Sequence, residues 1–245
     1  MSLCVGHVSE LWRYPVKSLG GERISTIHCT RRGFVADRWW AVLGHDGKLG
    51  SGKTTRRFRR MPGLLCVTSS TDADGEVWVH VEGLGSSRVG DPETAERLSE
   101  IVGERVTIVP DDATSHFDDA ALHLLTSSSL DWLTSRTPEV ARERRRFRPN
   151  IVIESDQLGR PEEAWVGRDL SVGFLTISVT KATERCVMVS MAQPGLAFAP
   201  RILRDLEDGA DALFGVYARV LDGGDVQLGD PVSILDPSEI SNEAR

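Results

Sequence analysis

The sequence contains few cysteines, and they lie far apart. There are four in 245 residues, at Cys4, Cys29, Cys66 and Cys186, and no two of them form a Cys-x-x-Cys pair. This spacing excludes a zinc-ribbon site or a cysteine-ligated iron–sulfur cluster built from a local motif. A disulfide framework is not expected in an intracellular chain of this size. Each cysteine is therefore interpreted by itself.

Long apolar runs are also absent. No run of about 18 apolar residues occurs, which excludes a membrane-spanning helix and gives no reason to expect a membrane partner. The first residues have no basic start followed by a long apolar stretch, the pattern of a secretory signal peptide. We therefore expect a cytoplasmic protein.

The chain has no excess of positive charge, since its formal net charge is −7. Nonspecific nucleic-acid binding normally needs an overall basic face, so we expect no nucleic-acid partner. Arginine is nevertheless concentrated in two places. The clusters are Arg56, Arg57, Arg59 and Arg60, and Arg142, Arg144, Arg145, Arg146 and Arg148. An acidic chain with two such clusters can bind a small anionic ligand.

The pattern of apolar residues predicts an α+β fold that is predominantly β. Short apolar or alternating runs in the first half predict strands, and glycine-containing turns separate them. These runs are Leu3–Tyr14, Arg23–Cys29, Arg38–Leu43, Leu64–Ser69 and Val77–Val81. A helix is predicted after Asp91, which is expected to be its N-cap, with Pro92 at the first helical position. Many short strands with turn signals favour a barrel or a sandwich.

The second half contains fewer regular signals. The polar stretch from Pro110 to Asp119 is the best candidate for a linker. A helix is predicted to begin at Thr126 and Ser127, where a short apolar run meets three serines. Another helix is expected from Pro200 to Leu213, and the segment from Phe214 to Asp230 is interpreted as a hairpin with a Gly-Gly turn.

One motif must be rejected. Residues Gly47 to Thr54 match the phosphate-loop pattern Gly-x-x-x-x-Gly-Lys-Ser/Thr, in which Lys53 and Thr54 would contact phosphates and magnesium. A true phosphate loop leads directly into a long helix whose dipole faces the phosphates. Here Pro62-Gly63 follows within barely two turns. We therefore interpret the segment as a basic loop between strands, and the nucleotide-enzyme alternative ranks low.

Seven motifs in a fixed order carry a resemblance to a known family. They are Tyr14-Pro-Val-Lys17-Ser18, Gly33-Phe-Val-Ala-Asp37-Arg38-Trp39-Trp40, Leu124-Leu-Thr126-Ser127 with Ser129-Leu130, Arg146-Phe-Arg148-Pro149-Asn150, Glu162-Glu-Ala-Trp165-Val-Gly167, Arg185-Cys186, and Phe214-Gly-Val-Tyr217 with Gly229-Asp-Pro-Val232. From about Val8 to Leu235 the chain resembles the MOSC family with its N-terminal β-barrel extension. That family includes amidoxime-reducing molybdenum enzymes and the C-terminal domain of molybdenum cofactor sulfurases.

The resemblance implies two domains and a cofactor. An N-terminal β-barrel-like domain would span residues 1–115 and pack on a MOSC β-barrel with a few helices at residues 116–245. The cofactor would be a molybdenum–pterin (Mo-molybdopterin), with Cys186 as catalytic residue and metal ligand. Lys17, Ser18, Arg38, Thr126, Ser127, Arg148 and Asn150 would hold it. The implied activity is reduction of a small N-hydroxylated substrate.

The chemistry of these residues suits such a ligand. A pyranopterin carries a phosphate, and Lys17, Ser18 and Arg38 supply charge and hydrogen bonds near strand ends. Thr126 and Ser127 have hydroxyls at a helix start, where free backbone N–H groups hold anions. Arg148 offers a planar fork for phosphate, and Asn150 points the same way along a strand. Cys186 follows Arg185, whose charge favours a thiolate, a soft metal ligand.

Other residues have plainer interpretations, and one family feature differs. Cys4, Cys29 and Cys66 lie in apparent strands and are expected in the core, as cysteine often is. Glu162 and Glu163 are interpreted as solvated loop carboxylates, and the histidines as core or surface residues. The family often has Thr-x-Arg before Pro-x-Leu, whereas here an extra basic run follows Thr55-Arg56-Arg57, so the role of the Arg56–Arg60 loop is open.

The electron donor and one alternative function complete the prediction. No ferredoxin-like cysteines follow the last motif, so electrons are expected from a separate flavin or iron–sulfur reductase. The alternative is a non-redox protein that carries the cofactor, or transfers sulfur as a persulfide on Cys186. No pyridoxal-phosphate domain is present to donate sulfur, which makes a self-contained sulfurase the weaker interpretation.

Overall fold

The computed structural model describes residues 2–112, 115–138 and 143–236. Within these segments strands carry most of the regular structure, and the α-helices are α1 (Pro92–Val102), α2 (Ser127–Arg136) and α3 (Arg201–Ala210). Short 3-10 turns are η1 (Pro62–Cys66), η3 (Arg145–Phe147), η4 (Pro161–Trp165) and η5 (Val187–Ser190). The α+β, predominantly β fold class predicted from the sequence is confirmed. In the described part of the chain, no helix is both long and apolar enough to span a membrane.

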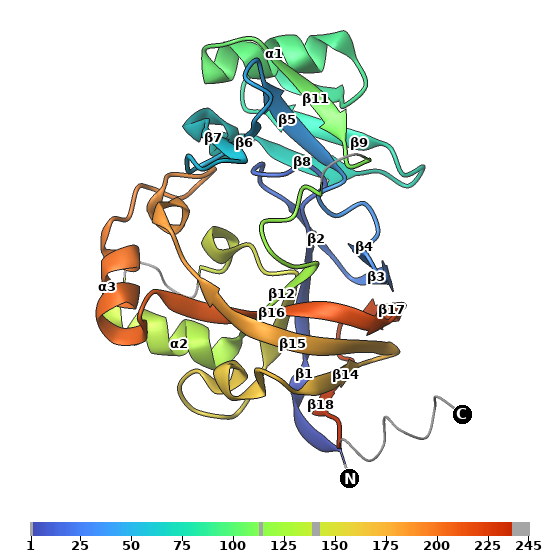
Figure 1. The fold of residues 1–245 in the computed structure, drawn as a ribbon, viewed down its shortest axis with the longest axis vertical. Coiled ribbons are helices and arrows are strands. Elements are labelled where there is room, and N and C mark those ends of the chain that lie inside the picture. The colour runs from blue at the N-terminus through green and yellow to red at the C-terminus, as the bar shows by residue number, and fades with distance from the viewer. Residues whose placement is uncertain (1, 113–114, 139–142, 237–245) are drawn as a thin grey trace.

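A closed β-barrel forms the lower half of the molecule in Figure 1. Its order is β13-β12-β16-β15-β14-β18-β1, the pairing of β1 with β13 closes the ring of seven strands, and β2 extends from β1. The strands are β1 (Leu3–Arg13), β2 (Glu22–Ile24), β12 (Leu122–Thr126), β13 (Ile151–Glu154), β14 (Asp169–Val172), β15 (Leu175–Glu184), β16 (Leu213–Asp222) and β18 (Pro231–Ile234). Leu175, Ile177 and Val179 alternate inward along β15 and are buried, because a strand turns successive side chains to opposite faces.

Two smaller sheets and α1 form a second body above the barrel, here called the upper module (Figure 1). Its strands are β5 (Trp40–Gly44), β6 (Leu49–Ser51), β7 (Phe58–Arg60), β8 (Thr68–Thr71), β9 (Val77–Val81), β10 (Gly85–Arg88) and β11 (Val106–Pro110). They pair as β11-β5-β6-β7 and as β10-β9-β8. A separate apolar core around Val42, Leu64 and Leu98 holds the module together, since burying each such side chain contributes roughly 1.5–3 kcal/mol.

Helix α1 begins where the sequence predicts it. Pro92 is its first residue, and Gly103 ends it with a left-handed φ of 76°, which glycine adopts without a steric penalty. The N-cap residue is Asp91, as predicted, but its side chain accepts no hydrogen bond from the helix. Its carboxylate accepts a hydrogen bond from the Arg88 N–H instead.

The two halves of the chain are interleaved rather than simply stacked. Strand β1 belongs to the barrel and pairs with β13 and β18 from the second half. A three-stranded sheet joins β17 (Gly224–Gln227) to β3 (Thr26–Thr30) and β4 (Gly33–Phe34). A division between residues 115 and 116 would separate these partners, and it stays a prediction.

Three local predictions are wrong. The segment after Phe214 is not a hairpin, because β17 pairs with β3, and Gly223 passes so close that a Cβ there would lie 2.6 Å from the Cys29 carbonyl oxygen. Leu64–Ser69 is not one strand, because Pro62 begins the turn η1 and β8 starts only afterwards. Among the cysteines predicted in the core, only Cys29 is buried, whereas Cys4 and Cys66 are exposed.

Candidate functional site

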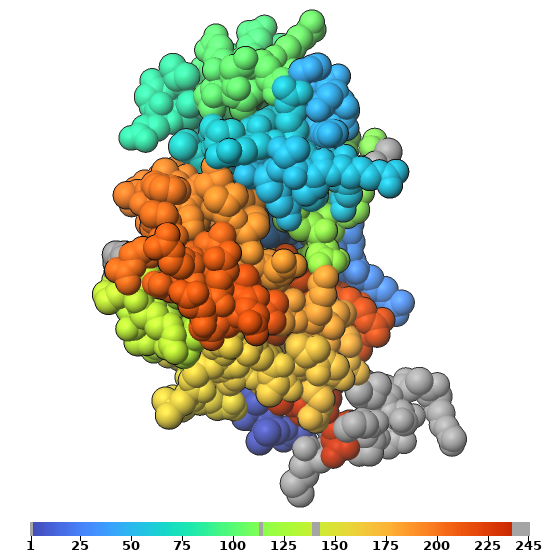
Figure 2. All heavy atoms as spheres, turned by 60° about the vertical axis from the view of Figure 1, so that its left-hand side comes forward, coloured from blue at the N-terminus to red at the C-terminus, as the bar shows by residue number. Residues whose placement is uncertain are grey.

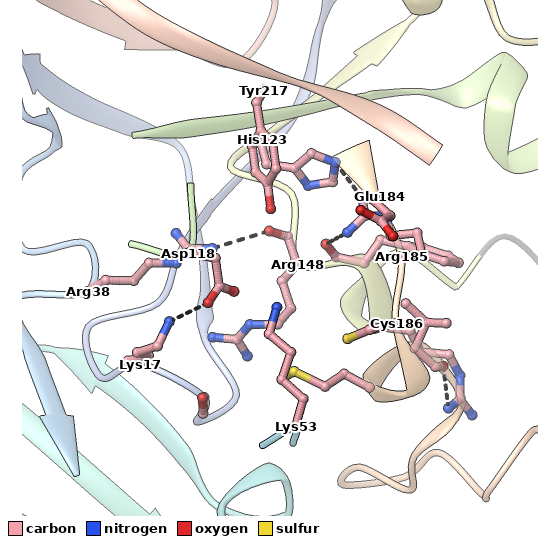
Figure 3. Close-up of a pocket in the computed structure, with 15 residues that line it drawn as sticks. Lys17, Arg38, Lys53, Asp118, His123, Arg148, Glu184, Arg185, Cys186 and Tyr217 are labelled. Carbon is pink, nitrogen blue, oxygen red and sulfur yellow. Dashed lines mark hydrogen bonds and ion pairs between the residues drawn. The ribbon is translucent and has the colours of Figure 1, made fainter. Parts of the chain in front are cut away.

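A cavity lies where the barrel meets the upper module. Figure 2 shows a hollow on this face, between the cyan segment of the upper module and the orange segment that follows β15. The cavity encloses about 660 Å³, its open mouth included. It is lined by Lys17, Ser18, Arg38, Lys53, Asp118, His123, Arg146, Phe147, Arg148, Glu184, Arg185, Cys186, Met188, Val189 and Tyr217. In Figure 3 the predicted cations Lys17, Arg38 and Arg148 lie opposite Cys186.

Lys17 lies in the turn that follows β1 and forms an ion pair across the cavity wall. Its Nζ is 2.9 Å from Asp118 Oδ1 and 4.5 Å from the centre of the Phe58 ring. Burial lowers the pKa of Lys17 to about 8, although Asp118 works to raise it. Burial alone would raise the pKa of Asp118, but the charge and hydrogen bond of Lys17 outweigh it and lower this pKa to about 2. At neutral pH the two groups are therefore a charged pair.

Arg38 and Arg148 both contribute a guanidinium group to the cavity wall. Arg38 is paired with the buried carboxylate of Asp37, and its Nη2 donates to the Arg148 carbonyl at 3.5 Å. Arg148 donates from Nη1 to the Leu19 carbonyl, whereas its Nη2 is buried without a partner among the described residues. Burial and the charge of Arg38 lower the pKa of Arg148 to about 10. A buried cationic donor without a partner is costly unless a ligand accepts from it.

Three residues of the cavity wall have left-handed backbones. The φ angles of Ser18, Arg38 and Arg148 are 68°, 54° and 55°. Residues other than glycine adopt this conformation rarely and at a cost of order 1–3 kcal/mol, and such strain concentrates at ligand sites. Because the Ser18 hydroxyl also donates to the Gly50 carbonyl at 2.9 Å, it ties this turn to the upper module.

Cys186 lies directly after β15, partly exposed, where the chain enters the turn η5. The neighbouring Arg185 side chain is fixed by the barrel. Its guanidinium donates to the carbonyls of Phe147 at 3.1 Å and Phe214 at 2.9 Å, and to His123 Nε2. Because an arginine can only donate, His123 Nε2 accepts and Nδ1 carries the proton. Burial and then the charge of Arg185 lower the pKa of His123 well below its ordinary value, so this imidazole is neutral.

The segment that follows Cys186 is held by a buried arginine. Arg146 donates to the carbonyls of Val189, Met191 at 2.9 Å and Ala197 at 2.6 Å. These bonds all use backbone carbonyls as acceptors, so they do not neutralise the charge of Arg146. The loop bearing Cys186 is therefore fixed on the barrel by a side chain that adds to the positive potential.

Thr126 and Ser127 do not line the cavity. They begin α2 as predicted, but the Thr126 hydroxyl donates to Glu162 Oε2 at 2.6 Å, and Ser129 donates to Oε1 at 2.6 Å. The Ser127 hydroxyl accepts from the Ser155 N–H at 3.1 Å. Glu162 is fully buried, so its prediction as a solvated carboxylate is wrong, and it places a protein carboxylate where a ligand phosphate was expected. Burial raises the pKa of Glu162.

Asn150 is also absent from the cavity lining. It is fully buried, its Oδ1 accepts from the His123 N–H at 3.2 Å, and its Nδ2 donates to the Trp12 carbonyl at 3.3 Å. The side chain thus ties β12 to β1. Its Oδ1 also accepts from Arg38 Nη1 at 3.4 Å, so Asn150 supports a cavity residue from behind.

The sequence interpretation missed several residues of the cavity. Asp118 lies in the predicted linker, and nothing in a polar run of Asp and Ser shows which carboxylate will meet Lys17. Tyr217 lies in one of the seven motifs, which gives it no role of its own, and its ring packs edge-on against His123 with centroids 5.7 Å apart. Lys53 belongs to the rejected phosphate-loop pattern and still reaches the cavity. Only this formal match drew attention to Lys53.

The rejection of the phosphate loop is confirmed. The segment contains β6 and is followed by β7, not by a helix. Gly50 and Gly52 are explained by packing, because a Cβ at Gly50 would lie 2.5 Å from Leu64 Cδ1 and one at Gly52 would collide with Met188. Gly47 is explained by its left-handed φ of 73°. Close contact of Gly52 with Met188 brings the upper module against the Cys186 loop.

Comparison with known proteins gives a consistent family. The MOSC domain matches residues 111–233, and the MOSC N-terminal beta barrel domain matches residues 5–128. Mitochondrial amidoxime-reducing component 1 of Homo sapiens is 24% identical, covering 94% of this chain and 83% of that protein. Mitochondrial amidoxime reducing component 2 of Bos taurus is 23% identical, covering 93% and 83%.

A solved structure supports the fold. The YuaD protein of Bacillus subtilis has a TM-score of 0.50 and 11% sequence identity, and the match covers 96% of both chains. At this identity the likeness concerns the fold alone. Because both family matches extend over half of the chain, and together run from residue 5 to residue 233, this chain belongs to the MOSC family.

Proposed function

We propose that the cavity binds a molybdenum–pterin cofactor and that the protein reduces small N-hydroxylated substrates with electrons from a separate flavin or iron–sulfur reductase. One observation carries the proposal. A cysteine, Cys186, faces a wall of strained and partly unpartnered cations across a single cavity. The relatives named as amidoxime-reducing components support the reaction class.

The charge of the cavity fits a ligand with a phosphate. Its lining holds six cationic side chains, Lys17, Arg38, Lys53, Arg146, Arg148 and Arg185, and two carboxylates, Asp118 and Glu184. Charge-assisted hydrogen bonds to phosphate oxygens are among the strongest in proteins, and a guanidinium can form two of them. Arg148, with its free Nη2, is the residue best placed to bind the phosphate, with Lys17, Ser18 and Arg38 beside it.

Cys186 fits a metal that brings most of its own ligands. In the segments that the structure describes, no group of three or more His, Cys, Asp or Glu side chains could hold a metal ion. A dithiolene-bound molybdenum needs only one further soft ligand from the protein, and a cysteine sulfur is suitable. When bound, the cofactor would supply the two-electron chemistry that removes oxygen from the substrate as water.

The chain's own residues would bind the cofactor and orient the substrate. Asp118 stays ionised above a pKa of about 2 and keeps Lys17 charged. Tyr217 lines the cavity near His123, and burial raises its pKa, so its hydroxyl remains a donor at neutral pH. Burial, and after it the charge of Arg185, lowers the pKa of His123 and keeps it neutral. These neutral donors can position an N–O group without competing with the cations for the phosphate.

Metal and pterin analysis of Cys186→Ala tests the proposal. Wild-type protein from a host with ample molybdenum and cofactor synthesis should contain molybdenum together with a pterin that gives fluorescent oxidation products. Cys186→Ala should lose the molybdenum, because the metal loses its protein ligand. Cys66→Ala is the matched control, since Cys66 is exposed and lies outside the cavity lining.

The same measurement distinguishes the alternative. Pterin without metal in both proteins would favour a cofactor carrier, and a persulfide on Cys186 would favour sulfur transfer. Wild-type protein with neither metal nor pterin would contradict the proposal. If metal and pterin are both present, turnover of an N-hydroxylated compound with an artificial electron donor tests the reaction itself.

A further inference from the structure

We infer that Tyr14 is a positioning residue whose buried ring holds the Arg38 and Arg148 guanidinium groups together, so that both face one anionic group in the cavity. The inference deepens the proposed function, on which it rests only for the identity of that anion. Tyr14 belongs to the same motif as Lys17 and Ser18, but no role follows from the motif itself.

The ring lies against both cations. Tyr14 is 2% exposed, and the distances from its ring centre to the Arg38 and Arg148 Cζ atoms are 4.9 Å and 4.2 Å. An aromatic ring has a negative face that attracts cations within about 6 Å, and the attraction grows when the pair is removed from water. A planar guanidinium also stacks well on such a ring.

The ring stabilises charge without neutralising it. The positive charge of Arg38 opposes that of Arg148, and each buried cation also loses hydration. Asp37 balances the charge of Arg38, whereas within the described chain the Arg148 guanidinium contacts the Leu19 carbonyl and this ring. A second carboxylate in place of the ring would balance the remaining charge and remove the attraction for a ligand. The aromatic support thus preserves an anion site.

The backbone fixes the ring relative to both arginines. The Tyr14 N–H donates to Asp37 Oδ1 at 2.7 Å, and the Tyr14 carbonyl accepts from the Arg38 N–H at 2.8 Å. The Tyr14 hydroxyl is buried and has no partner in the described chain. Unlike Arg148, Tyr14 is not among the residues that line the cavity, so its aromatic face, against both arginines, is the part of the side chain that acts.

A pair of variants separates the face from the hydroxyl. Tyr14→Phe keeps the face, and Tyr14→Leu removes it while leaving an apolar side chain. Full-length protein made in a host without pterin synthesis is titrated with inorganic phosphate by calorimetry. We expect Tyr14→Phe to bind phosphate within about twofold of wild type, and Tyr14→Leu to bind at least about tenfold more weakly, a loss typical of a desolvated cation–π contact.

Three results would overturn the inference. They are equal weakening by Phe and Leu, unchanged binding in Tyr14→Leu, and no phosphate binding by the wild type. Thermal unfolding of each variant checks that it is folded, and Tyr14→Met, which has a similar length and no aromatic face, replaces the leucine variant if that one does not fold. Pterin content tests the proposed function separately, so loss of phosphate binding in Tyr14→Leu would support the inference even if the wild type carries no pterin.

Discussion

The N-terminus of α2 and the cavity both gather hydrogen-bond donors suited to an anion, yet the protein treats them differently. At α2 the donors are the hydroxyls of Thr126 and Ser129, and the buried carboxylate of Glu162 accepts from both. In the cavity the donors are cations whose neighbours are mostly aromatic rings and carbonyls, and Arg148 keeps an unpartnered Nη2. The hydroxyl donors at α2 find their acceptor within the chain, whereas Arg148 Nη2 in the cavity does not.

This difference shows what distinguishes a structural anion site from a binding site. Hydroxyls and helix N–H groups attract an anion wherever they occur, and a buried carboxylate of the chain itself is the simplest occupant. A ligand site must stabilise its cations and still leave them hydrogen-bond donors that are free to bind the ligand. The rings of Tyr14 and Phe58, each beside two or more cations, achieve this in the cavity.

The largest effect is expected for a substitution in the cavity, and it is an effect on phosphate affinity. Arg148→Met removes a charge-assisted donor worth about 1.5–3 kcal/mol, so we expect phosphate affinity to fall about tenfold to a hundredfold. Stability should change little, because a costly buried charge is removed as well. Calorimetric titration and urea unfolding measure the two quantities. Loss of stability without loss of phosphate affinity would show that Arg148 has a structural role and does not bind the ligand.

At the N-terminus of α2 we expect a substitution to lower stability and leave phosphate affinity unchanged. Thr126→Val removes the helix cap and one donor to Glu162, which should lower the free energy of unfolding by about 2 kcal/mol. Phosphate affinity and pterin content per folded molecule should stay unchanged. Urea unfolding measures the first effect. A variant of normal stability that had lost its pterin would return Thr126 to the set of cofactor-binding residues.

A smaller effect concerns pH. Lys17 has a pKa of about 8, below its ordinary value, so it loses its charge as pH rises through 8. Sulfate, whose charge is constant in this range, should therefore bind about tenfold more weakly at pH 9 than at pH 7, one pKa unit corresponding to about 1.4 kcal/mol. Because the unfolded chain holds this proton up to higher pH, the contribution of Lys17 to stability rises between its folded and unfolded pKa.

Lys17→Arg is the matched control for that titration. An arginine stays charged throughout the range, so sulfate affinity should become nearly independent of pH. An equal decline in wild type and variant would show that another group titrates.

The smallest effect is expected at the former phosphate-loop pattern. Within the described residues, the Thr54 hydroxyl accepts a single hydrogen bond, from the Arg60 N–H at 3.3 Å. Thr54→Ala should therefore change the free energy of unfolding by less than about 0.5 kcal/mol and leave sulfate binding unaltered. If the protein bound a nucleotide with magnesium and Thr54→Ala abolished that binding, the packing explanation of Gly50 and Gly52 would be contradicted.

Sequence reasoning succeeded where chemistry is local. Lys17, Ser18 and Arg38 lie inside contiguous motifs and all line the cavity, and the start of α1 follows from Asp91 and Pro92. The predominantly β fold class likewise follows from short strands and turns. These features depend on neighbours within a few residues, which a single sequence contains.

It failed where a residue's role depends on a distant partner. Glu162 and Thr126 are 36 positions apart, and Asp118 and Lys17 are 101 apart, so neither pair is visible as a pattern. The pairing of β17 with β3 instead of β16 depends on the same long-range closure. The predicted start of α2 therefore locates the hydrogen-bond donors correctly, but it does not identify the Glu162 carboxylate that accepts from them.

Anomalous diffraction at the molybdenum edge, from crystals of metal-loaded protein, tests the central claim most directly. The account predicts one strong peak in the cavity, bonded to Cys186 Sγ, with phosphate density against Arg148. A peak away from Cys186, or phosphate density at the N-terminus of α2 in place of the Glu162 carboxylate, would contradict it.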